Sequence, residues 1–260
     1  MIKQLESSTV RKINSGQVIT DMKSVVKELV ENSLDAGADY IDIRLEDSGF
    51  GSITVADNGS GISRKDRSLC ALGHHTSKIV DLSSLESLAS YGFRGEALHS
   101  ICECATSVQI TTMTSSEKSA TTVTYSHTGT PDSTKSAPAI SAVPLTAHTH
   151  GTTIVASGLW GSHPVSKEYL RSLTKTEARK IQEMMLSYAL IRPDVRFVLK
   201  NPPAKIFVSG PCPDVGQSVL TNYGPLLFET LQKVEFSTET VKIEGFLPSK
   251  NAEKSIALRK

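Results

Sequence analysis

The chain has 260 residues, of which 28 are Lys or Arg and 27 are Asp or Glu, so its formal net charge is +1. This balance creates no global field that would draw the protein to nucleic acid or to a membrane surface. Hydrophobic residues make up 38% of the chain, enough for a core in one large domain or two smaller ones. No segment has the apolar length of a membrane span or of a secretory signal, so we expect a soluble, intracellular protein.

The cysteine content argues against a disulfide framework and against a zinc site. Four cysteines are too few for a disulfide scaffold at this length. No Cys-x-x-Cys pair occurs, and the spacing of Cys102 and Cys104 is too tight for the usual chelating turn. We therefore expect inert thiols rather than a zinc site built from Cys70, His74, His75, His99, Cys102 and Cys104.

Residues 24–36 are predicted to form a helix that carries its polar groups on one side. At about 100° per residue, Glu28, Asn32 and Asp35 fall on one narrow stripe. The apolar residues of the same segment point the opposite way, so a packed helix offers two carboxylates and a carboxamide to one space. These groups are oxygen ligands for a hard cation plus a candidate base. The alternative is an ordinary solvated polar face.

The next elements predict an α+β architecture. Residues 41–45 and 53–55 alternate apolar and polar side chains on either side of a glycine turn, which is typical of a half-buried antiparallel hairpin. A helix followed by such a hairpin indicates a sandwich with helices on one face of a sheet. Further strands are predicted at 107–113, 121–125 and 151–155, and a helix at 96–105.

The remainder of the chain predicts a loop, a long helix and a second domain. Residues 115–149 are rich in Ser, Thr, Ala and Pro, which favours a mobile surface loop around short strands. A single helix is predicted from 166 to 191, followed by strands at 195–199, 205–208 and 241–246. We place the domain boundary near residue 205, which divides the chain into domains 1–204 and 205–260.

The motif Asp57-Asn58-Gly59-Ser60-Gly61 follows the predicted strand that ends at Ala56. One interpretation is simple chain reversal, because Asn-Gly pairs are common in hairpin turns. However, the second glycine permits another group to approach the backbone closely. A carboxylate buried at a strand end also needs a partner, and an exocyclic amine such as that of adenine would supply one.

Two further motifs precede or open the helix at 96–105. The motif Thr76-Ser77-Lys78-Ile79 is weak evidence for a binding site by itself, since a helix cap followed by a surface lysine has the same sequence pattern. In the segment from Tyr91 to Leu98, two glycines precede a helical pattern, and the amides of such a segment can form an anion site. The alternative is an ordinary glycine turn. A Walker-type phosphate loop is absent.

The order of these motifs resembles the GHKL ATPase superfamily, which includes gyrase-type topoisomerases, heat-shock chaperones, histidine kinases and MutL. Within it, Glu-Leu-Val-Glu-Asn-Ser-Leu-Asp-Ala-Gly-Ala, Thr-Ser-Lys-Ile and Gly-Phe-Arg-Gly-Glu-Ala-Leu are similar to MutL-type mismatch-repair proteins, over most of residues 10–160. Later stretches such as Gly-Phe-Leu-Pro at 245–248 are most similar to the eukaryotic PMS branch. The resemblance implies a Bergerat-type sandwich of helices on a mixed, mostly antiparallel sheet, followed by the start of an α/β transducer domain.

The resemblance also implies roles for individual residues. Glu28 would be the general base that activates water, and Asn32 would hold Mg²⁺ against the phosphates of ATP. Asp57 would accept from the adenine amino group, helped through water by Thr152, while Asp35 would support the helix and nearby loops. The remaining nucleotide-binding positions would be Gly59, Gly61, Thr76, Ser77, Lys78, Gly92, Phe93, Arg94, Gly95, Glu96, Ala97 and Leu98.

For the whole protein, the resemblance implies a slow ATPase that acts as a conformational switch in DNA mismatch repair. Its expected partners are another MutL homologue in a heterodimer, mismatch-recognition proteins of the MutS type, and DNA bound weakly without sequence specificity. A nuclear location is expected, with no membrane association. Basic residues of the 166–191 helix could meet DNA phosphates, or they could form a solvated helix face.

Two other classes of function stay open. In the family, a lysine from beyond the position of Lys260 reaches the γ-phosphate, so turnover in this chain is expected to be weak or incomplete. The chain could then act as a nucleotide-sensing or partner-binding module without hydrolysis. A different GHKL enzyme, such as a kinase or a topoisomerase, is disfavoured because no phospho-acceptor His region or nucleophilic Tyr domain is recognisable.

Overall fold

The computed structural model describes residues 17–78, 90–92, 94–137, 150–161 and 163–249. They divide into two compact units, one drawn from Met1–Met185 and Phe197–Val208, the other from Leu186–Arg196 and Ser209–Lys260. Up to residue 209 the elements are α2 (Met22–Asp35), β1 (Tyr40–Glu46), the 3-10 helix η1 (Asp47–Gly49), β2 (Ser52–Asp57), α3 (Ala97–Cys104), β3 (Ser107–Met113), β4 (Ala120–Tyr125), β5 (Pro131–Ala137), β6 (Gly151–Ser157), α4 (Pro164–Ser172), α5 (Thr174–Ile191), β7 (Arg196–Asn201) and β8 (Ala204–Ser209).

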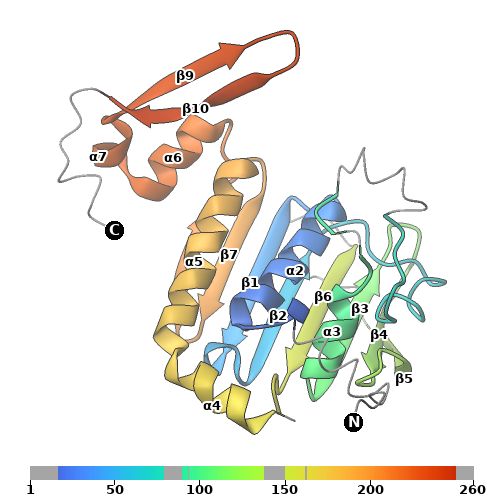
Figure 1. Cartoon of the computed structure of the whole chain (residues 1–260). Helices are drawn as coiled ribbons and strands as arrows, with labels where there is room; N and C mark the ends of the chain where they lie inside the picture. Colours follow the sequence, from blue (N-terminus) through green and yellow to red (C-terminus); the bar gives the residue numbers. More distant parts are fainter. Residues whose placement is uncertain (1–16, 79–89, 93, 138–149, 162, 250–260) are drawn as a thin grey trace, which may run out of the picture. The chain divides into compact units, whose positions relative to one another are not determined.

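The first unit is built on an eight-stranded sheet with the order β5-β4-β3-β6-β2-β1-β7-β8. The pairings of β1 with β2, β2 with β6, β6 with β3, β3 with β4 and β4 with β5 are all antiparallel. Helices α2 and α3 lie on one face of this sheet (Figure 1). The predicted α+β sandwich with helices on one face of a mostly antiparallel sheet is therefore confirmed.

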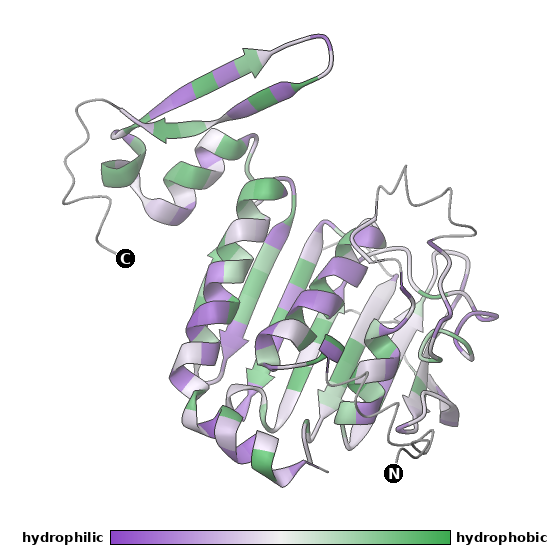
Figure 2. Cartoon of the chain, in the orientation of Figure 1, coloured by the Kyte–Doolittle hydropathy of each residue, from purple (hydrophilic) through white to green (hydrophobic). Residues whose placement is uncertain are grey.

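Helix α2 packs its apolar side on the centre of the sheet and leaves its polar side open. Val25, Val26, Leu29 and Val30 are all buried, while Figure 2 shows polar residues along the side that faces away from the strands. The helix starts earlier than predicted because Asp21 caps it: the Asp21 carboxylate accepts from the amide of Ser24 at 2.7 Å, and the Ser24 hydroxyl accepts from the Asp21 amide at 3.1 Å.

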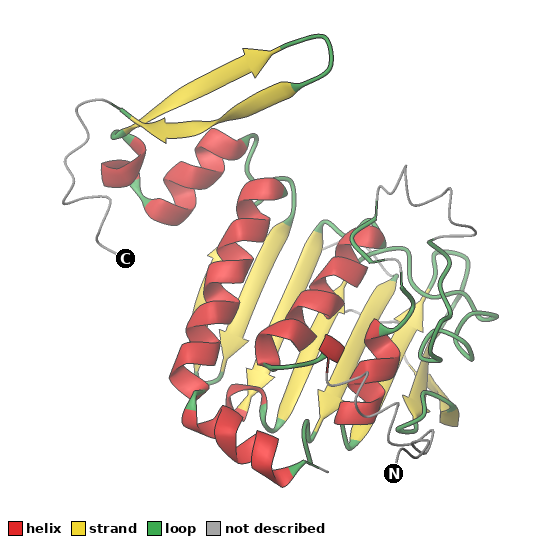
Figure 3. Cartoon of the chain, in the orientation of Figure 1, coloured by secondary structure: helices red, strands yellow, loops and turns green. Residues whose placement is uncertain are grey.

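Two predictions about the first unit need correction. The helix expected at 166–191 is two helices, α4 and α5, separated at Leu173 (Figure 3). Pro164 stands at the first turn of α4, where its missing amide proton is tolerated. The predicted loop around short strands at 115–149 contains one strand that the sequence did not locate, β5, an exposed edge strand without an apolar face. Residues 138–149 lie outside the described residues.

The second unit contains α6 (Val215–Tyr223), α7 (Pro225–Phe228), β9 (Leu231–Ser237) and β10 (Lys242–Pro248). β9 and β10 form an antiparallel two-stranded sheet, and Phe246 of β10 lies 5.9 Å from Phe228 of α7 between ring centroids. Of these elements the sequence predicted only the strand at 241–246. This unit also takes in residues 186–196, and the predicted division into domains 1–204 and 205–260 stays a prediction. None of the described helices has the length and apolarity to cross a membrane.

The burial of Leu29 on α2 predicts how strongly its truncation should destabilise the fold. Leu29→Ala is expected to lower the free energy of unfolding by about 2–5 kcal/mol, because the truncated side chain leaves a cavity between the helix and the sheet. Urea denaturation followed by circular dichroism measures the change. Val165→Ala is the control: that side chain is 84% exposed, and its truncation should change the free energy by less than about 0.5 kcal/mol.

Candidate functional site

A cavity of about 940 Å³ opens in the first unit beside the polar side of α2. Its walls come from α2, from the segment that follows β2, from the segment that precedes α3, and from β6. These are the parts of the chain that carry the motifs singled out in the sequence. The cavity is lined by Glu28, Asn32, Asp57, Gly61, Thr76, Ser77, Lys78, Gly92, Arg94, Gly95, Glu96, Ala97, Leu98 and Thr152.

Asp57 forms the floor of the cavity at the end of β2, where it is 5% exposed. Its Oδ2 accepts a hydrogen bond from the Ser33 hydroxyl at 2.8 Å. Its Oδ1 accepts from the amides of Gly59 at 2.9 Å and Thr152 at 3.3 Å. The register explains the last contact, because Asp57 stands opposite Thr152 in the β2–β6 pairing. The carboxylate is thus fixed in position and points at the cavity as an acceptor.

Burial raises the pKa of Asp57 above its usual value, although the hydrogen bonds from Gly59, Ser33 and Thr152 oppose the shift. A ligand that donates to this carboxylate favours the ionised form. At a pH between the raised pKa of Asp57 in the free protein and its lower pKa in the complex, binding must therefore release a proton from Asp57.

This gives a prediction about pH. The affinity for a ligand that donates to Asp57 should rise with pH through the raised pKa and level off above it. Calorimetric titrations in mildly acidic buffers of different ionisation enthalpy should detect the released proton. Affinity that is independent of pH across the acidic range would show that Asp57 does not contact the ligand's donor.

Lys78 reaches across the cavity to the polar side of α2. Its Nζ lies 2.9 Å from Asn32 Oδ1 and 2.5 Å from Asp35 Oδ2. Asp35 also accepts from the amides of Tyr91 at 2.8 Å and Gly92 at 3.0 Å. Asp35 therefore holds the glycine segment and the lysine against the helix, the supporting role expected for it. Asn32 presents its oxygen to a positive charge.

Glu28 stands one helical turn before Asn32 on the same side of α2. It lines the cavity, and its side chain is 23% exposed. Lys27 Nζ lies 3.3 Å from Glu28 Oε1 and 2.7 Å from Glu31 Oε2, so the two glutamates share one ammonium. The predicted stripe of Glu28, Asn32 and Asp35 is therefore present and faces a cavity rather than bulk solvent.

The two glycines of the motif after β2 are required by the protein's own packing. Gly61 has a positive φ of 74°, and a Cβ there would lie 2.3 Å from the Met113 carbonyl oxygen. A Cβ on Gly59 would lie 2.8 Å from Ala36 Cβ. Gly59 is also not among the described residues that line the cavity. Its absent side chain lets the turn approach α2, and direct contact with a ligand stays a prediction.

The remaining residues of interest are a serine that the sequence did not assign to the site, one predicted site residue without a described position, and the cysteines. Ser33, which is not among the predicted site residues, is 3% exposed and holds Asp57 in place, while Phe93 lies outside the described residues. Burial raises the pKa of Cys102 to about 12 and that of Cys104 to about 11, as expected for inert thiols. In the part of the chain that the structure describes, no three His, Cys, Asp or Glu side chains are grouped to hold a metal ion.

Sequence comparison finds relatives among mismatch-repair proteins. The chain is 38% identical to PMS1 protein homolog 1 of Homo sapiens over 98% of this chain and 27% of that protein. It is 36% identical to the DNA mismatch repair protein MutL of Shewanella pealeana over 96% of this chain and 39% of that protein. The chain thus spans between about a quarter and two fifths of the length of these relatives.

Solved structures have the same fold. The N-terminal domain of a DNA repair protein superposes with a TM-score of 0.73 at 29% identity, covering 91% of this chain and 70% of that one. The Aquifex aeolicus MutL ATPase domain complexed with ADP superposes with a TM-score of 0.63 at 24% identity, covering 89% of this chain and 78% of that one.

A family model described as histidine kinase-, DNA gyrase B- and HSP90-like ATPase matches residues 19–152. This range contains α2, the Asp57 floor and the segment that leads into α3, and it ends on Thr152. The chain therefore belongs to the histidine kinase-, DNA gyrase B- and HSP90-like ATPase family, as the order of its motifs predicted.

Proposed function

We propose that this chain is the ATP-binding and slowly hydrolysing N-terminal part of a MutL-like DNA mismatch-repair protein, in which the bound nucleotide drives a conformational switch. The observation that carries this proposal is the Asp57 floor of the cavity. A fixed, buried carboxylate at the bottom of a cavity of this size suits a base with an exocyclic amine. The relatives named above are mismatch-repair proteins.

The proposed binding mode places adenine on Asp57 and Thr152 and the triphosphate towards Asn32. Backbone amides and the N-terminal end of α3 border the phosphate side, where Gly92, Gly95 and Ala97 line the cavity. Such amides stabilise phosphate charge. Thr76, Ser77, Lys78, Arg94, Glu96 and Leu98 border the same side.

The residues around Asn32 fit a divalent cation that accompanies the nucleotide. Asn32 Oδ1 already accepts from a cation, the Lys78 ammonium, at 2.9 Å. An amide oxygen is the type of ligand that Mg²⁺ takes together with phosphate oxygens. When bound, Mg²⁺ would neutralise charge that develops on the phosphates. Asn32 would hold it, and Lys78 would leave Asn32 and turn to the phosphates.

Hydrolysis is assigned to Glu28, which would orient a water molecule and accept its proton as the water attacks the γ-phosphate. Positioning and charge stabilisation supply most of the catalysis in phosphoryl transfer, and one base, one divalent cation and a ring of amides would provide them. The ion pair with Lys27 favours a second candidate function. Glu28 Oε1 lies 3.3 Å from the Lys27 ammonium, so this oxygen already has a partner other than water, and the chain could then sense nucleotide without turning it over.

Single-turnover hydrolysis separates the two candidates. Excess protein is mixed with radiolabelled ATP and Mg²⁺, and bound nucleotide and released phosphate are followed in parallel. Binding followed by slow formation of phosphate supports the ATPase. Binding without phosphate release supports the nucleotide-sensing module, and the absence of binding contradicts both.

The proposal extends to the partners of the whole protein. By similarity to the mismatch-repair relatives, we assign a second MutL homologue and a MutS-type protein as partners. By similarity to the eukaryotic relatives alone, we assign a nuclear location. Contact with DNA should be weak and without sequence specificity. On α4 and α5, Arg171 lies 3.3 Å from Asp47, Arg179 lies 3.7 Å from Glu183, and Lys180 lies 2.8 Å from Glu177. These ion pairs neutralise part of the positive charge that would otherwise be available to DNA phosphates.

A further inference from the structure

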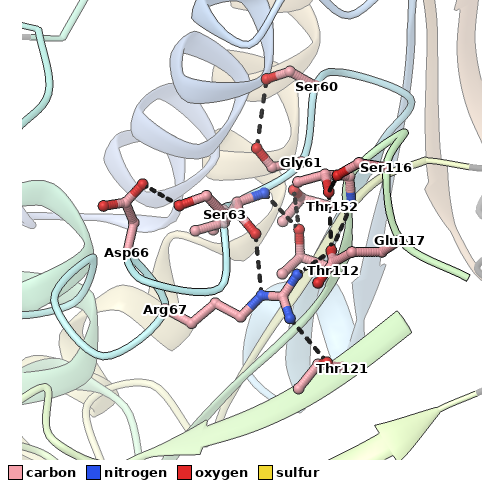
Figure 4. A network of polar contacts seen from close by, with 12 residues as sticks. Ser60, Gly61, Ser63, Asp66, Arg67, Thr112, Ser116, Glu117, Thr121 and Thr152 are labelled. Atoms are coloured by element: carbon pink, nitrogen blue, oxygen red, sulfur yellow. Dashed lines mark hydrogen bonds and ion pairs between the residues drawn. The ribbon is translucent and has the colours of Figure 1, made fainter. Parts of the chain in front are cut away.

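Thr112 is a fully buried threonine of β3 that lies behind the floor of the cavity. Its Oγ1 accepts from the Ile62 amide at 2.8 Å and donates to the Gly151 carbonyl at 3.2 Å. The same oxygen lies 3.1 Å from Thr152 Oγ1 (Figure 4). Thr112 itself is not among the described residues that line the cavity, whereas Thr152 is.

Counting protons fixes the direction of the hydrogen bond between the two hydroxyls. Each hydroxyl has one proton and two lone pairs. We assign the proton of Thr112 to the Gly151 carbonyl, which can only accept, and with this assignment the proton between Thr112 and Thr152 comes from Thr152. The lone pairs of Thr152 Oγ1 then remain for the cavity. Thr152 and Asp57 together present acceptors to whatever binds there.

Arg67 holds the backbone carbonyl of Ile62. Its Nε donates to the Ile62 carbonyl at 3.0 Å, while the Ile62 amide donates to Thr112. Ile62 directly follows Gly61 and lines the cavity. The backbone amide and carbonyl of Ile62 are therefore both occupied, and this part of the cavity wall cannot move without breaking one of these hydrogen bonds.

Arg67 is in turn fixed by the β3–β4 hairpin. The residue is 5% exposed. One terminal nitrogen donates to Thr121 Oγ1 at 2.9 Å, and the other forms a short ion pair with Glu117 Oε2 (Figure 4). Glu117 Oε2 also accepts from the Thr114 amide at 2.9 Å. A buried guanidinium with all these partners is a rigid support, because any displacement leaves donors unpaired.

From these contacts we infer that Thr112, supported through Ile62 by Arg67, is a positioning residue that selects the base of the nucleotide. By keeping the proton of Thr152 away from the cavity, Thr112 makes the floor an array of acceptors. An amino group, such as that of adenine, can satisfy this array. A carbonyl oxygen at the same place, as in guanine, faces two acceptors and no donor. The inference rests on the proposed function, because it requires a nucleotide base on Asp57.

The test compares the dissociation constants of ATP and GTP, each with Mg²⁺, by displacement of a fluorescent nucleotide. Thr112→Val keeps the shape of the side chain and removes its hydroxyl, which frees the Thr152 hydroxyl to turn. The preference for ATP over GTP should fall by about tenfold, the equivalent of one hydrogen bond. Thr112→Ser restores the hydroxyl and should restore the preference.

Thr111→Val is the matched control. Thr111 is the neighbouring residue on the same strand, and its hydroxyl pairs at 2.8 Å with Thr122 instead of the cavity floor. This change should leave the ATP preference as it is. A purely structural role for Thr112 would lower the melting temperature and weaken both nucleotides equally, and that result would overturn the inference.

A second variant keeps the test decisive if Thr112→Val does not fold. Arg67→Lys retains a positive charge near Glu117 but removes the Nε donor to the Ile62 carbonyl. It should also lower the ATP preference. An unmutated chain that binds neither nucleotide contradicts the proposed function itself. If the unmutated chain prefers ATP and the folded variants retain that preference in full, only the positioning role is wrong.

Discussion

Replacement of Glu28 by alanine is expected to abolish ATP turnover while ATP still binds. The side chain lines the cavity from α2, and its assigned role is to accept a proton from water rather than to hold the nucleotide. Removing a general base typically lowers the rate by about 10²–10⁴-fold. The dissociation constant should stay within about threefold of the unmutated value, because no binding contact is assigned to this carboxylate.

Rapid-quench measurement of phosphate release, together with equilibrium binding, checks this expectation. Glu183→Ala is the control, since Glu183 is an exposed glutamate of α5 whose partner is Arg179. That variant should hydrolyse and bind ATP normally. A Glu28→Ala protein that hydrolyses ATP at the original rate would show that the base has been wrongly assigned.

Replacement of Asp57 by asparagine should have the opposite effect and remove nucleotide binding. Donors from Ser33, Gly59 and Thr152 already converge on this carboxylate. An asparagine has a single acceptor oxygen and adds two donors of its own. Any rotamer therefore leaves a donor of the base or of the protein facing another donor. The affinity for ATP should fall on the order of 100-fold.

Thermal unfolding of the ligand-free protein distinguishes this effect from loss of the fold. Burial disfavours the ionised form of Asp57. In the variant, the Ser33 hydroxyl can donate to the Leu29 carbonyl, 3.1 Å away, and accept from the asparagine amide. The melting temperature at neutral pH should therefore change little. Asp42→Asn is the control: Asp42 lies on the neighbouring strand β1, is paired with Lys200 at 2.5 Å and is not among the residues found to line the cavity. Unchanged ATP affinity in Asp57→Asn would contradict the proposed floor of the site.

The first elements of the fold could be predicted because their signals are local. The polar stripe of α2 and the alternation in β1 and β2 depend on residues within one element, and all three elements formed close to the expected bounds. β5 could not be predicted in this way. It is an edge strand whose residues are nearly all exposed, so neither of its faces needs apolar side chains.

In the site, too, the arrangement within one helix could be predicted, whereas contacts between residues far apart in the sequence could not. The sequence placed Glu28 and Asn32 on one face because their spacing along the helix determines it. The contact between Ser33 and Asp57 joins residues 24 positions apart. That between Lys78 and Asn32 joins residues 46 positions apart. Both depend on how α2 packs on β2 and on the path of the segment after β2, which no single element reveals.

A structure of the chain with Mg²⁺ and a non-hydrolysable ATP analogue would show whether adenine binds on the Asp57 floor. We expect the amino group of adenine to lie within hydrogen-bonding distance of the Asp57 carboxylate and Lys78 to have left Asn32. A nucleotide bound elsewhere, or a cavity in which Lys78 still bridges Asn32 and Asp35 at saturating nucleotide, would contradict it.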